Sequence, residues 1–229
     1  MLIIADKRLP GEALQKLGDH GEVVPFETSG ITYEAVAGHP DIFFCRVNET
    51  LIVAPNLPSF YLNLLQERKI GFITGDEPVG SKYPETARYN AVSTGQHLLH
   101  NFRYTDSKIT GYAGDLDLVH LNQGYARCNI IPIGDDRFIT SDEGVYRTLV
   151  RHDIKALLVS PEGILLPGFK HGFIGGAAGV RGDAVFFSGS LHHYRDGAAV
   201  RKFLSDESCR IIELYDGPLF DGGSIFFID

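Results

Sequence analysis

The feature that most constrains the fold is a strand–strand–helix–strand pattern, and it is clearest in the middle of the chain. Residues 129–133 read as an apolar strand that ends at the turn-forming residues 134–136. Residues 137–140 read as a second strand. Ser141 and Asp142 can cap a helix, and residues 155–160 read as a third strand. This order predicts one compact structural unit.

The same order of elements recurs on both sides of that unit. Residues 40–76 give strand, turn, strand, short helix and strand, and residues 175–216 repeat the order. Residues 88–122 give three strands, with a loop around Gly111 and Gly114 expected in place of a helix. The apolar positions expected to face inward from the helices are Leu14, Leu17, Val145, Leu149, Val150, Val200, Phe203 and Leu204.

The two ends of the chain complete a fifth copy. Residues 221–229 supply one strand, and residues 2–26 supply a strand, a helix and a strand. Equivalent first-strand positions then recur roughly every 40 to 50 residues, a spacing typical of repeat architectures. Pairing the terminal strands would remove open sheet edges. The pattern therefore predicts one α/β domain over residues 1–229, a closed pseudo-fivefold propeller with one unit split across the termini and one lacking its helix. An ordinary open α/β sheet is the alternative.

Composition narrows the classes of partner. The formal net charge is −8, which argues against a nucleic-acid partner, because such a surface is usually basic. The three cysteines, Cys45, Cys128 and Cys209, are widely spaced and odd in number, which favours a reducing compartment. Neither a signal peptide nor a membrane-spanning run is apparent. We therefore expect a cytoplasmic protein that binds neither membrane nor nucleic acid.

The pattern resembles the pentein fold, the α/β-propeller of guanidino-group-modifying enzymes such as arginine deiminases. The stretches HPDIFF, LIVAPN, NQGYARCN, LLPGFKHGFIGG and DGGSIFF resemble an uncharacterised bacterial family associated with that fold. The resemblance implies a site at the centre of the ring, with a Cys nucleophile, a His general acid/base and carboxylates that hold a guanidinium. The sequence departs from this in two places: Phe226 and Phe227 stand where the Cys is expected, and Tyr125 or a neighbour stands where the His is expected.

If the first strands start near the axis, the polar residues at their beginnings converge there. This predicts a ring in which Gly175 and Gly176 allow close approach of the backbone. The candidate polar residues are His39, Asp41, Arg88, Asn90, Arg127, Cys128, Asn129 and Asp221.

Cys128 is the best candidate nucleophile, since Arg127 beside it could favour the thiolate. His39 is the candidate base, and Asp41 and Asp221 are candidates to hold a cation. Each residue also has a structural interpretation. The structural alternatives are a small buried packing residue for Cys128, turn residues for His39 and Asp41, and a loop carboxylate for Asp221.

Two functions follow from these residues. The first is a central polar pocket for a small cationic or amide-bearing ligand, with C–N bond hydrolysis through Cys128 as its chemistry. The second is a non-catalytic interaction module of the same fold, favoured by the replaced C-terminal Cys. No cofactor or metal site is expected, because neither the glycines at 175–179 nor His192 and His193 lie in a suitable pattern. A protein partner and a monomeric or homodimeric state are both left open.

Overall fold

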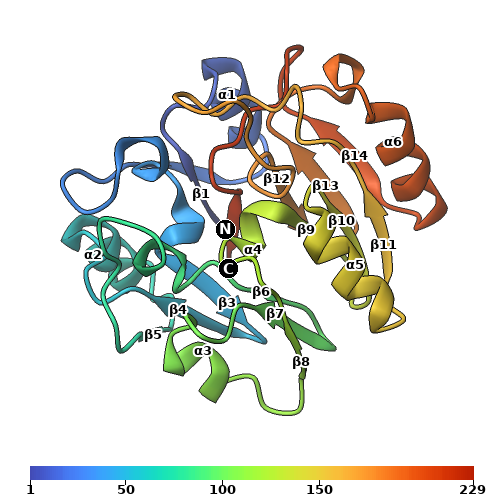
Figure 1. The fold of residues 1–229 in the computed structure, drawn as a ribbon. Coiled ribbons are helices and arrows are strands. Elements are labelled where there is room, and N and C mark those ends of the chain that lie inside the picture. The colour runs from blue at the N-terminus through green and yellow to red at the C-terminus, as the bar shows by residue number, and fades with distance from the viewer.

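The computed structural model describes all residues from 1 to 229 and shows five three-stranded sheets arranged around one axis (Figure 1). In ring order, the sheets comprise β15 (Phe226–Ile228), β1 (Leu2–Asp6) and β2 (Glu22–Phe26); β3 (Phe44–Val47), β4 (Thr50–Val53) and β5 (Phe72–Thr74); β6 (Val92–Ser93), β7 (His97–His100) and β8 (Asp117–His120); β9 (Ile130–Ile133), β10 (Arg137–Thr140) and β11 (Lys155–Leu158); and β12 (Ala178–Arg181), β13 (Ala184–Phe187) and β14 (Arg210–Glu213).

Every sheet has the same topology. The first strand pairs antiparallel with the second, and the second pairs parallel with the third, as in β9, β10 and β11. In the four continuous units a short hairpin joins the antiparallel pair. In every unit the parallel pair needs a crossover, which a helix supplies. The predicted closed propeller of strand–strand–helix–strand units is therefore confirmed.

The unit split across the termini is also confirmed. Strand β15 pairs antiparallel with β1, with Leu2 opposite Ile228 and Ile4 opposite Phe226. The two chain ends meet near the middle of the ring (Figure 1). This pairing gives β1 a neighbour on both sides, so it joins the ring without an open edge.

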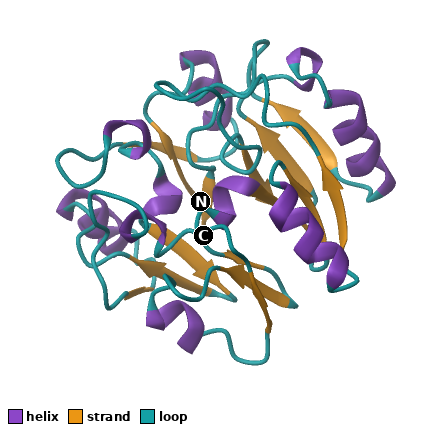
Figure 2. Ribbon diagram, viewed as in Figure 1, coloured by secondary structure: helices purple, strands orange, loops and turns teal.

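The longer helices lie on the outside of the ring (Figure 2). The α-helices are α1 (Gly11–Gly18), α2 (Ser59–Glu67), α3 (Ser107–Gly111), α4 (Ala126–Asn129), α5 (Glu143–Arg151) and α6 (Gly197–Asp206), and the 3-10 helices are η1 (Glu34–Val36), η2 (Pro40–Ile42), η3 (Glu85–Ala87) and η4 (Leu191–His193). None of them is long and apolar enough to cross a membrane.

Helix α5 shows how the local sequence determines where a helix begins and which of its residues are buried. The Asp142 side chain accepts a hydrogen bond from the Val145 backbone N–H at 2.8 Å, which caps the helix as expected. Val145 and Leu149 are buried, but Val150 is 50% exposed, so its predicted inward position is wrong. Val150 directly follows Leu149, and adjacent helical positions point about 100° apart.

The other helices follow the expected faces more closely. Leu17, Val200 and Leu204 are buried, and Leu14 and Phe203 are partly buried. The expectation that the unit at residues 88–122 lacks a helix is wrong, because α3 occupies the crossover between β7 and β8. Asp106 caps α3 by accepting from the Lys108 N–H at 2.9 Å. Five residues are too few to show helical periodicity in the sequence.

Candidate functional site

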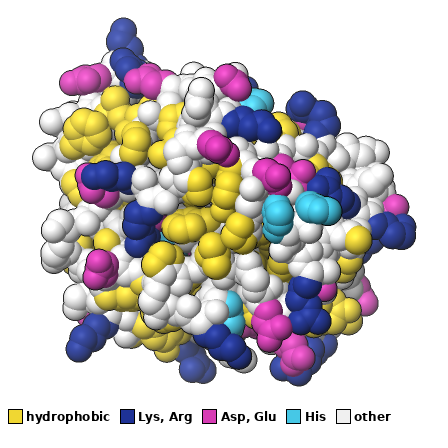
Figure 3. All heavy atoms as spheres, turned by 90° about the horizontal axis from the view of Figure 1, so that it is seen from above, with side chains coloured by type: hydrophobic (Ala, Val, Ile, Leu, Met, Phe, Trp, Pro, Cys, Tyr) yellow, Lys and Arg dark blue, Asp and Glu magenta, His cyan; other side chains and the backbone are white.

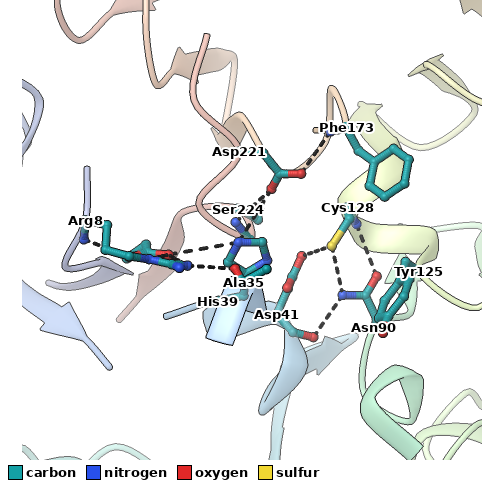
Figure 4. Close-up of polar contacts among 12 residues, drawn as sticks. Arg8, Ala35, His39, Asp41, Asn90, Tyr125, Cys128, Phe173, Asp221 and Ser224 are labelled. Carbon is teal, nitrogen blue, oxygen red and sulfur yellow. Dashed lines mark hydrogen bonds and ion pairs between the residues drawn. The ribbon is translucent and has the colours of Figure 1, made fainter. Parts of the chain in front are cut away.

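The site is formed by short helical turns that precede the first strands of the units. Helix η2 carries Asp41 and leads into β3, while Asn90 follows η3 and leads towards β6. Cys128 lies on α4, ahead of β9, and Asp221 precedes β15. The sequence pattern places strand starts here, but Cys128 and Asn129 are in a single helical turn instead. These turns bring side chains from distant parts of the chain together near the axis (Figure 4).

Cys128 is held by two polar neighbours. Its Sγ donates a hydrogen bond to Asp41 Oδ2 at 2.9 Å, and Asn90 Nδ2 lies 3.4 Å from the same sulfur. Asn90 Oδ1 also accepts from the Cys128 backbone N–H at 3.1 Å, and Asn90 Nδ2 donates to the Asp41 carbonyl at 3.2 Å. Asn90 therefore ties the backbones of two units together and fixes the thiol against the carboxylate.

His39 lies on the other side of this group, between two carboxylates. Its Nε2 is 3.9 Å from Asp221 Oδ1 and 3.9 Å from Asp6 Oδ2. These separations are too long for hydrogen bonds, and neither ring nitrogen of His39 has a hydrogen-bond partner although the residue is only 1% exposed. Buried polar groups are usually hydrogen-bonded, so His39 is an exception that calls for a functional reason.

Asp6 and Arg8 form a pair at the edge of the site that the sequence did not single out. Arg8 Nη2 lies 2.5 Å from Asp6 Oδ2, and the same nitrogen donates to the Ala35 carbonyl at 2.9 Å. The pair neutralises Asp6 and fixes the segment that leads to His39. Asp6 ends an apolar strand, and its position alone carries no functional signal.

Burial controls the protonation of the site. Desolvation raises the pKa of Asp41 to about 6 and that of Asp221 to about 6. Desolvation, followed by the negative charges of Asp41 and Asp221, raises the pKa of the Cys128 thiol well above its ordinary value. Desolvation also lowers the pKa of His39. Burial and the two carboxylates thus outweigh the attraction between Arg127 and a Cys128 thiolate in setting the direction of the thiol pKa.

Two glycines make the close packing of the site possible. A Cβ added at Gly176 would overlap Asp221 Oδ1, as the predicted need for close approach implies. Gly223 has a φ of +67°, and a Cβ there would overlap His39. Gly223 therefore meets both a steric and a conformational requirement.

A cavity of about 240 Å³ opens onto this group. Cys128, His39 and Asp221 contribute to its lining. The remaining lining residues are mostly aromatic or apolar: Tyr33, Val36, Tyr125, Leu166, Phe169, Lys170, His171 and Phe173. The Tyr125 hydroxyl lies 2.5 Å from Thr86 Oγ1 and 3.1 Å from the Tyr33 hydroxyl, which fixes one wall. The cavity thus combines a polar floor with apolar walls, as ligand sites commonly do.

Three predicted site residues point elsewhere. Arg127 Nε donates to Ser224 Oγ at 3.1 Å, and the guanidinium lies 5.5 Å from the centre of the Phe226 ring, in a separate hollow of about 510 Å³. Asn129 Nδ2 donates to the Tyr125 carbonyl at 3.0 Å. Arg88 lies 3.7 Å from Glu77 and donates to the Pro78 carbonyl. The structure brings together His39, Asp41, Asn90, Cys128 and Asp221. Of these, His39, Cys128 and Asp221 line the cavity, while Asp41 and Asn90 contact Cys128 from behind.

Comparison with known proteins supports the fold. Residues 4–226 match the profile of a family described as "Family of unknown function (DUF6873)". No curated protein matches the sequence.

Three solved structures illustrate the similarity. DDAH from Pseudomonas aeruginosa is 10% identical, with 93% of this chain and 91% of that chain covered and a TM-score of 0.50. SxtG, an amidinotransferase from Microseira wollei, is 12% identical, with 93% and 87% covered and a TM-score of 0.57. Agmatine deiminase from C. jejuni is 13% identical, with 93% and 74% covered and a TM-score of 0.56. At these identities the similarity is one of fold.

Proposed function

Because the chain belongs to the Family of unknown function (DUF6873) and has the pentein fold, we propose that its axial cavity binds a small molecule with a cationic amidine or guanidine head group. Asp41 and Asp221 are the partners of that head group. The observation that carries the proposal is a pair of fully buried carboxylates, with no Lys or Arg side chain within 4 Å of either. Asp221 lines the cavity, and Asp41 lies directly behind Cys128, which also lines it. Buried charges are normally paired, and a ligand cation would complete the pair.

The unpaired oxygen of Asp41 supports this proposal. Asp41 Oδ2 accepts from Cys128, whereas the buried Oδ1 has no hydrogen-bond partner. A planar N–H donor from an amidine or guanidine would satisfy that oxygen with a charge-assisted hydrogen bond. The side chain of Asp41 thus has one oxygen bonded within the protein and one without a partner.

The walls of the cavity suit the rest of such a ligand. Tyr33, Tyr125 and Phe173 present aromatic surface near the polar floor, and aromatic faces attract cations and apolar chains. The volume of about 240 Å³ limits the occupant to a small molecule. Lys170 and His171 also line the cavity and can contact a polar tail.

We further propose C–N bond hydrolysis as the chemistry of this site. Cys128 Sγ would form a bond to the central carbon of the bound head group while its thiol proton passes to Asp41 Oδ2. The C–N bond would then break, and the departing amine would take up that proton, with His39 positioned to relay it. Water would then attack the carbon and the C–S bond would break, giving a urea or amide. One proton of the water would restore the thiol, and the other would leave with the released amine or to solvent. The bound cation would supply the charge that favours the thiolate.

A non-catalytic interaction module is the second candidate, and one observation favours it. Leu165 and Phe169 are 47% and 55% exposed beside the cavity, although both are large apolar side chains. Viewed from above, hydrophobic side chains gather near the middle of the molecular surface among charged ones (Figure 3). Apolar surface of this kind can serve as a docking site. The replacement of the expected C-terminal Cys by Phe226 and Phe227 points the same way.

Calorimetric titration with alkylguanidines of increasing chain length tests the proposed function. The wild-type protein should bind at least one of them, and Asp221→Asn should weaken binding at least tenfold, since it removes one charge from the floor. Asp115→Asn, at an exposed position, is the matched control and should bind like the wild type. Equal binding by all three proteins would contradict the proposal. No binding by the wild-type protein would favour the interaction module.

A further inference from the structure

We propose that His39, Asp41 and Cys128 form a binding site for a thiophilic divalent cation, with Zn²⁺ as the expected type. One donor atom from each residue lies within 4.8 Å of the other two, and all three residues are buried. Nitrogen, carboxylate oxygen and thiolate sulfur are the three donor types that zinc takes from proteins. Sequence spacing gives no hint of this group, because Asp41 and Cys128 are 87 residues apart.

Unsatisfied polar atoms provide an independent indication of a ligand. Both ring nitrogens of His39 and the Oδ1 atom of Asp41 are buried without a hydrogen-bond partner. A metal ion bound by one His39 nitrogen and one Asp41 oxygen would satisfy an atom on each residue. Leaving such groups buried and unpaired is unfavourable, so their retention at one place favours a ligand-binding role.

The geometry requires only a small adjustment. Bond lengths of about 2.0–2.3 Å in a tetrahedral zinc site place donor atoms roughly 3.3–3.8 Å apart. Cys128 Sγ and Asp41 Oδ2 are now 2.9 Å apart because a thiol proton lies between them. Binding of the metal ion would release this proton to solvent and put a metal–sulfur bond in its place. The charge of the cation would offset the negative charge of the thiolate and the carboxylate.

Surrounding residues are placed to support the ligands. Asn90 Nδ2 lies 3.4 Å from Cys128 Sγ and can donate to a thiolate. Asp221 and Asp6 lie 3.9 Å from His39 Nε2, and carboxylates next to a metal-binding His commonly orient its ring. His39 and Cys128 also line the axial cavity, so a fourth position on the metal ion would face open space. Three protein ligands and one open position are typical of a catalytic or regulatory zinc site rather than a closed structural one.

A metal ion and the proposed guanidine or amidine ligand would bind at overlapping positions. The metal inference does not depend on the guanidine or amidine ligand. Both occupants are cations, and both would contact Asp41. The metal ion can be titrated alone, and the guanidine titrations can be run with a chelator present. Failure of one proposal is therefore distinguishable from failure of the other.

Titration of the metal-free protein with Co²⁺ tests the inference. A thiolate bound to Co²⁺ gives a sulfur-to-metal charge-transfer band in the near ultraviolet, and one equivalent of Zn²⁺ should abolish it by displacement. The wild-type protein should show the band. Cys128→Ser should lose it, while Cys209→Ser, at a half-buried cysteine outside the group, should keep it. His39→Gln should weaken Co²⁺ binding at least about tenfold.

A second readout covers the case in which Cys128→Ser does not fold. In the wild-type protein, Zn²⁺ should slow alkylation of Cys128 at least tenfold and leave Cys209 unaffected, as measured by peptide mass spectrometry. The inference is overturned if Cys128→Ser folds and keeps the charge-transfer band. It is equally overturned if saturating Zn²⁺ leaves the alkylation rate of Cys128 unchanged.

Discussion

The Cys128 thiol donates a hydrogen bond to Asp41 Oδ2 at 2.9 Å, joining the unit that begins with β9 to the unit that begins with β3. The pair is buried, and burial and the nearby carboxylates raise the thiol pKa. Burial and these carboxylates therefore favour the protonated thiol of Cys128. A cation at the cavity floor, organic or metallic, is the change that would release its proton.

Slow alkylation of Cys128 in the native protein is the first consequence. Only the thiolate reacts, and desolvation keeps its fraction small. At neutral pH, Cys209, which is half-buried, should react first, and Cys128 should react at least tenfold more slowly than a free thiol. Peptide mass spectrometry after timed iodoacetamide treatment measures each rate. A Cys128 that reacts as fast as a free thiol would contradict the assigned protonation state.

Asp41→Asn should leave stability unchanged or raise it slightly. The substitution keeps the shape of the side chain and removes a buried carboxylate that has one unpaired oxygen, and relief of such a charge offsets the altered hydrogen bond to Cys128. We expect the free energy of unfolding to stay within about 1 kcal/mol of wild type or to increase. Urea denaturation with a chelator present measures it, and a loss above about 3 kcal/mol would show that the carboxylate is needed for folding.

Gly176→Ala should damage the site by steric overlap. The added methyl group would meet Asp221 Oδ1, and overpacking of this kind costs about 1–3 kcal/mol. Gly18→Ala is the matched control, because its Cβ would have no neighbour within 4 Å, at the end of helix α1. It should be neutral or slightly stabilising. Thermal unfolding of both variants compares the two effects, and equal melting temperatures would refute the close approach at Gly176.

Closure of the ring by β15 should contribute strongly to stability. Ile228 is 1% exposed and lies opposite Leu2 in the pairing of β15 with β1. Ile228→Ala should lower the free energy of unfolding by about 2–5 kcal/mol, whereas Asp229→Ala should change it little. Denaturant titration of the two variants provides the measurement. Similar stabilities would mean that β15 does not hold the ring closed.

His100 should make the protein less stable in mild acid. Desolvation lowers its pKa to about 4, from an ordinary value of 6.5, and the neutral ring bonds to Thr105 Oγ1 at 2.6 Å and to the Gly124 carbonyl at 2.8 Å. The unfolded chain binds this proton at higher pH than the folded chain. The contribution of the neutral His100 ring to the free energy of unfolding is thus complete above pH 6.5. It decreases by roughly 3 kcal/mol as the pH falls towards 4.

His100→Gln provides the comparison for that effect. Glutamine can replace the two hydrogen bonds but does not titrate in this range. Unfolding free energies between pH 7 and pH 4 should therefore fall less steeply in the variant. Identical slopes for the two proteins would show that His100 does not couple folding to pH.

The sequence predicted the ring because its signals are local and repeated. Apolar runs ended by Gly and Asp turns mark the strands, and the equivalent positions Asp41, Asn90 and Asn129 recur at a spacing typical of repeats. The fold comparison and the five sheets agree with that interpretation. Helix α3 was missed because a five-residue helix shows no period.

Side-chain directions could not be predicted in the same way. Cys128 and Arg127 are adjacent in the sequence, but on the single turn of α4 one faces the cavity and the other faces Ser224. The predicted strand began at residue 129, so the alternation of side chains along a strand did not assign sides to Arg127 and Cys128. The role of Asp6 and Arg8 was also missed. The two residues are neighbours in the sequence, but the segment that Arg8 contacts, around Ala35, is distant from them.

The charge preference of the axial cavity tests the central claim most directly. An alkylguanidine and the alkylurea of the same chain length have nearly the same shape but differ by one positive charge. Calorimetric titration of the wild-type protein, with a chelator present, compares their affinities. If Asp41 and Asp221 hold a cation, the guanidine should bind at least tenfold more tightly. Equal affinities, or tighter binding of the urea, would contradict the account.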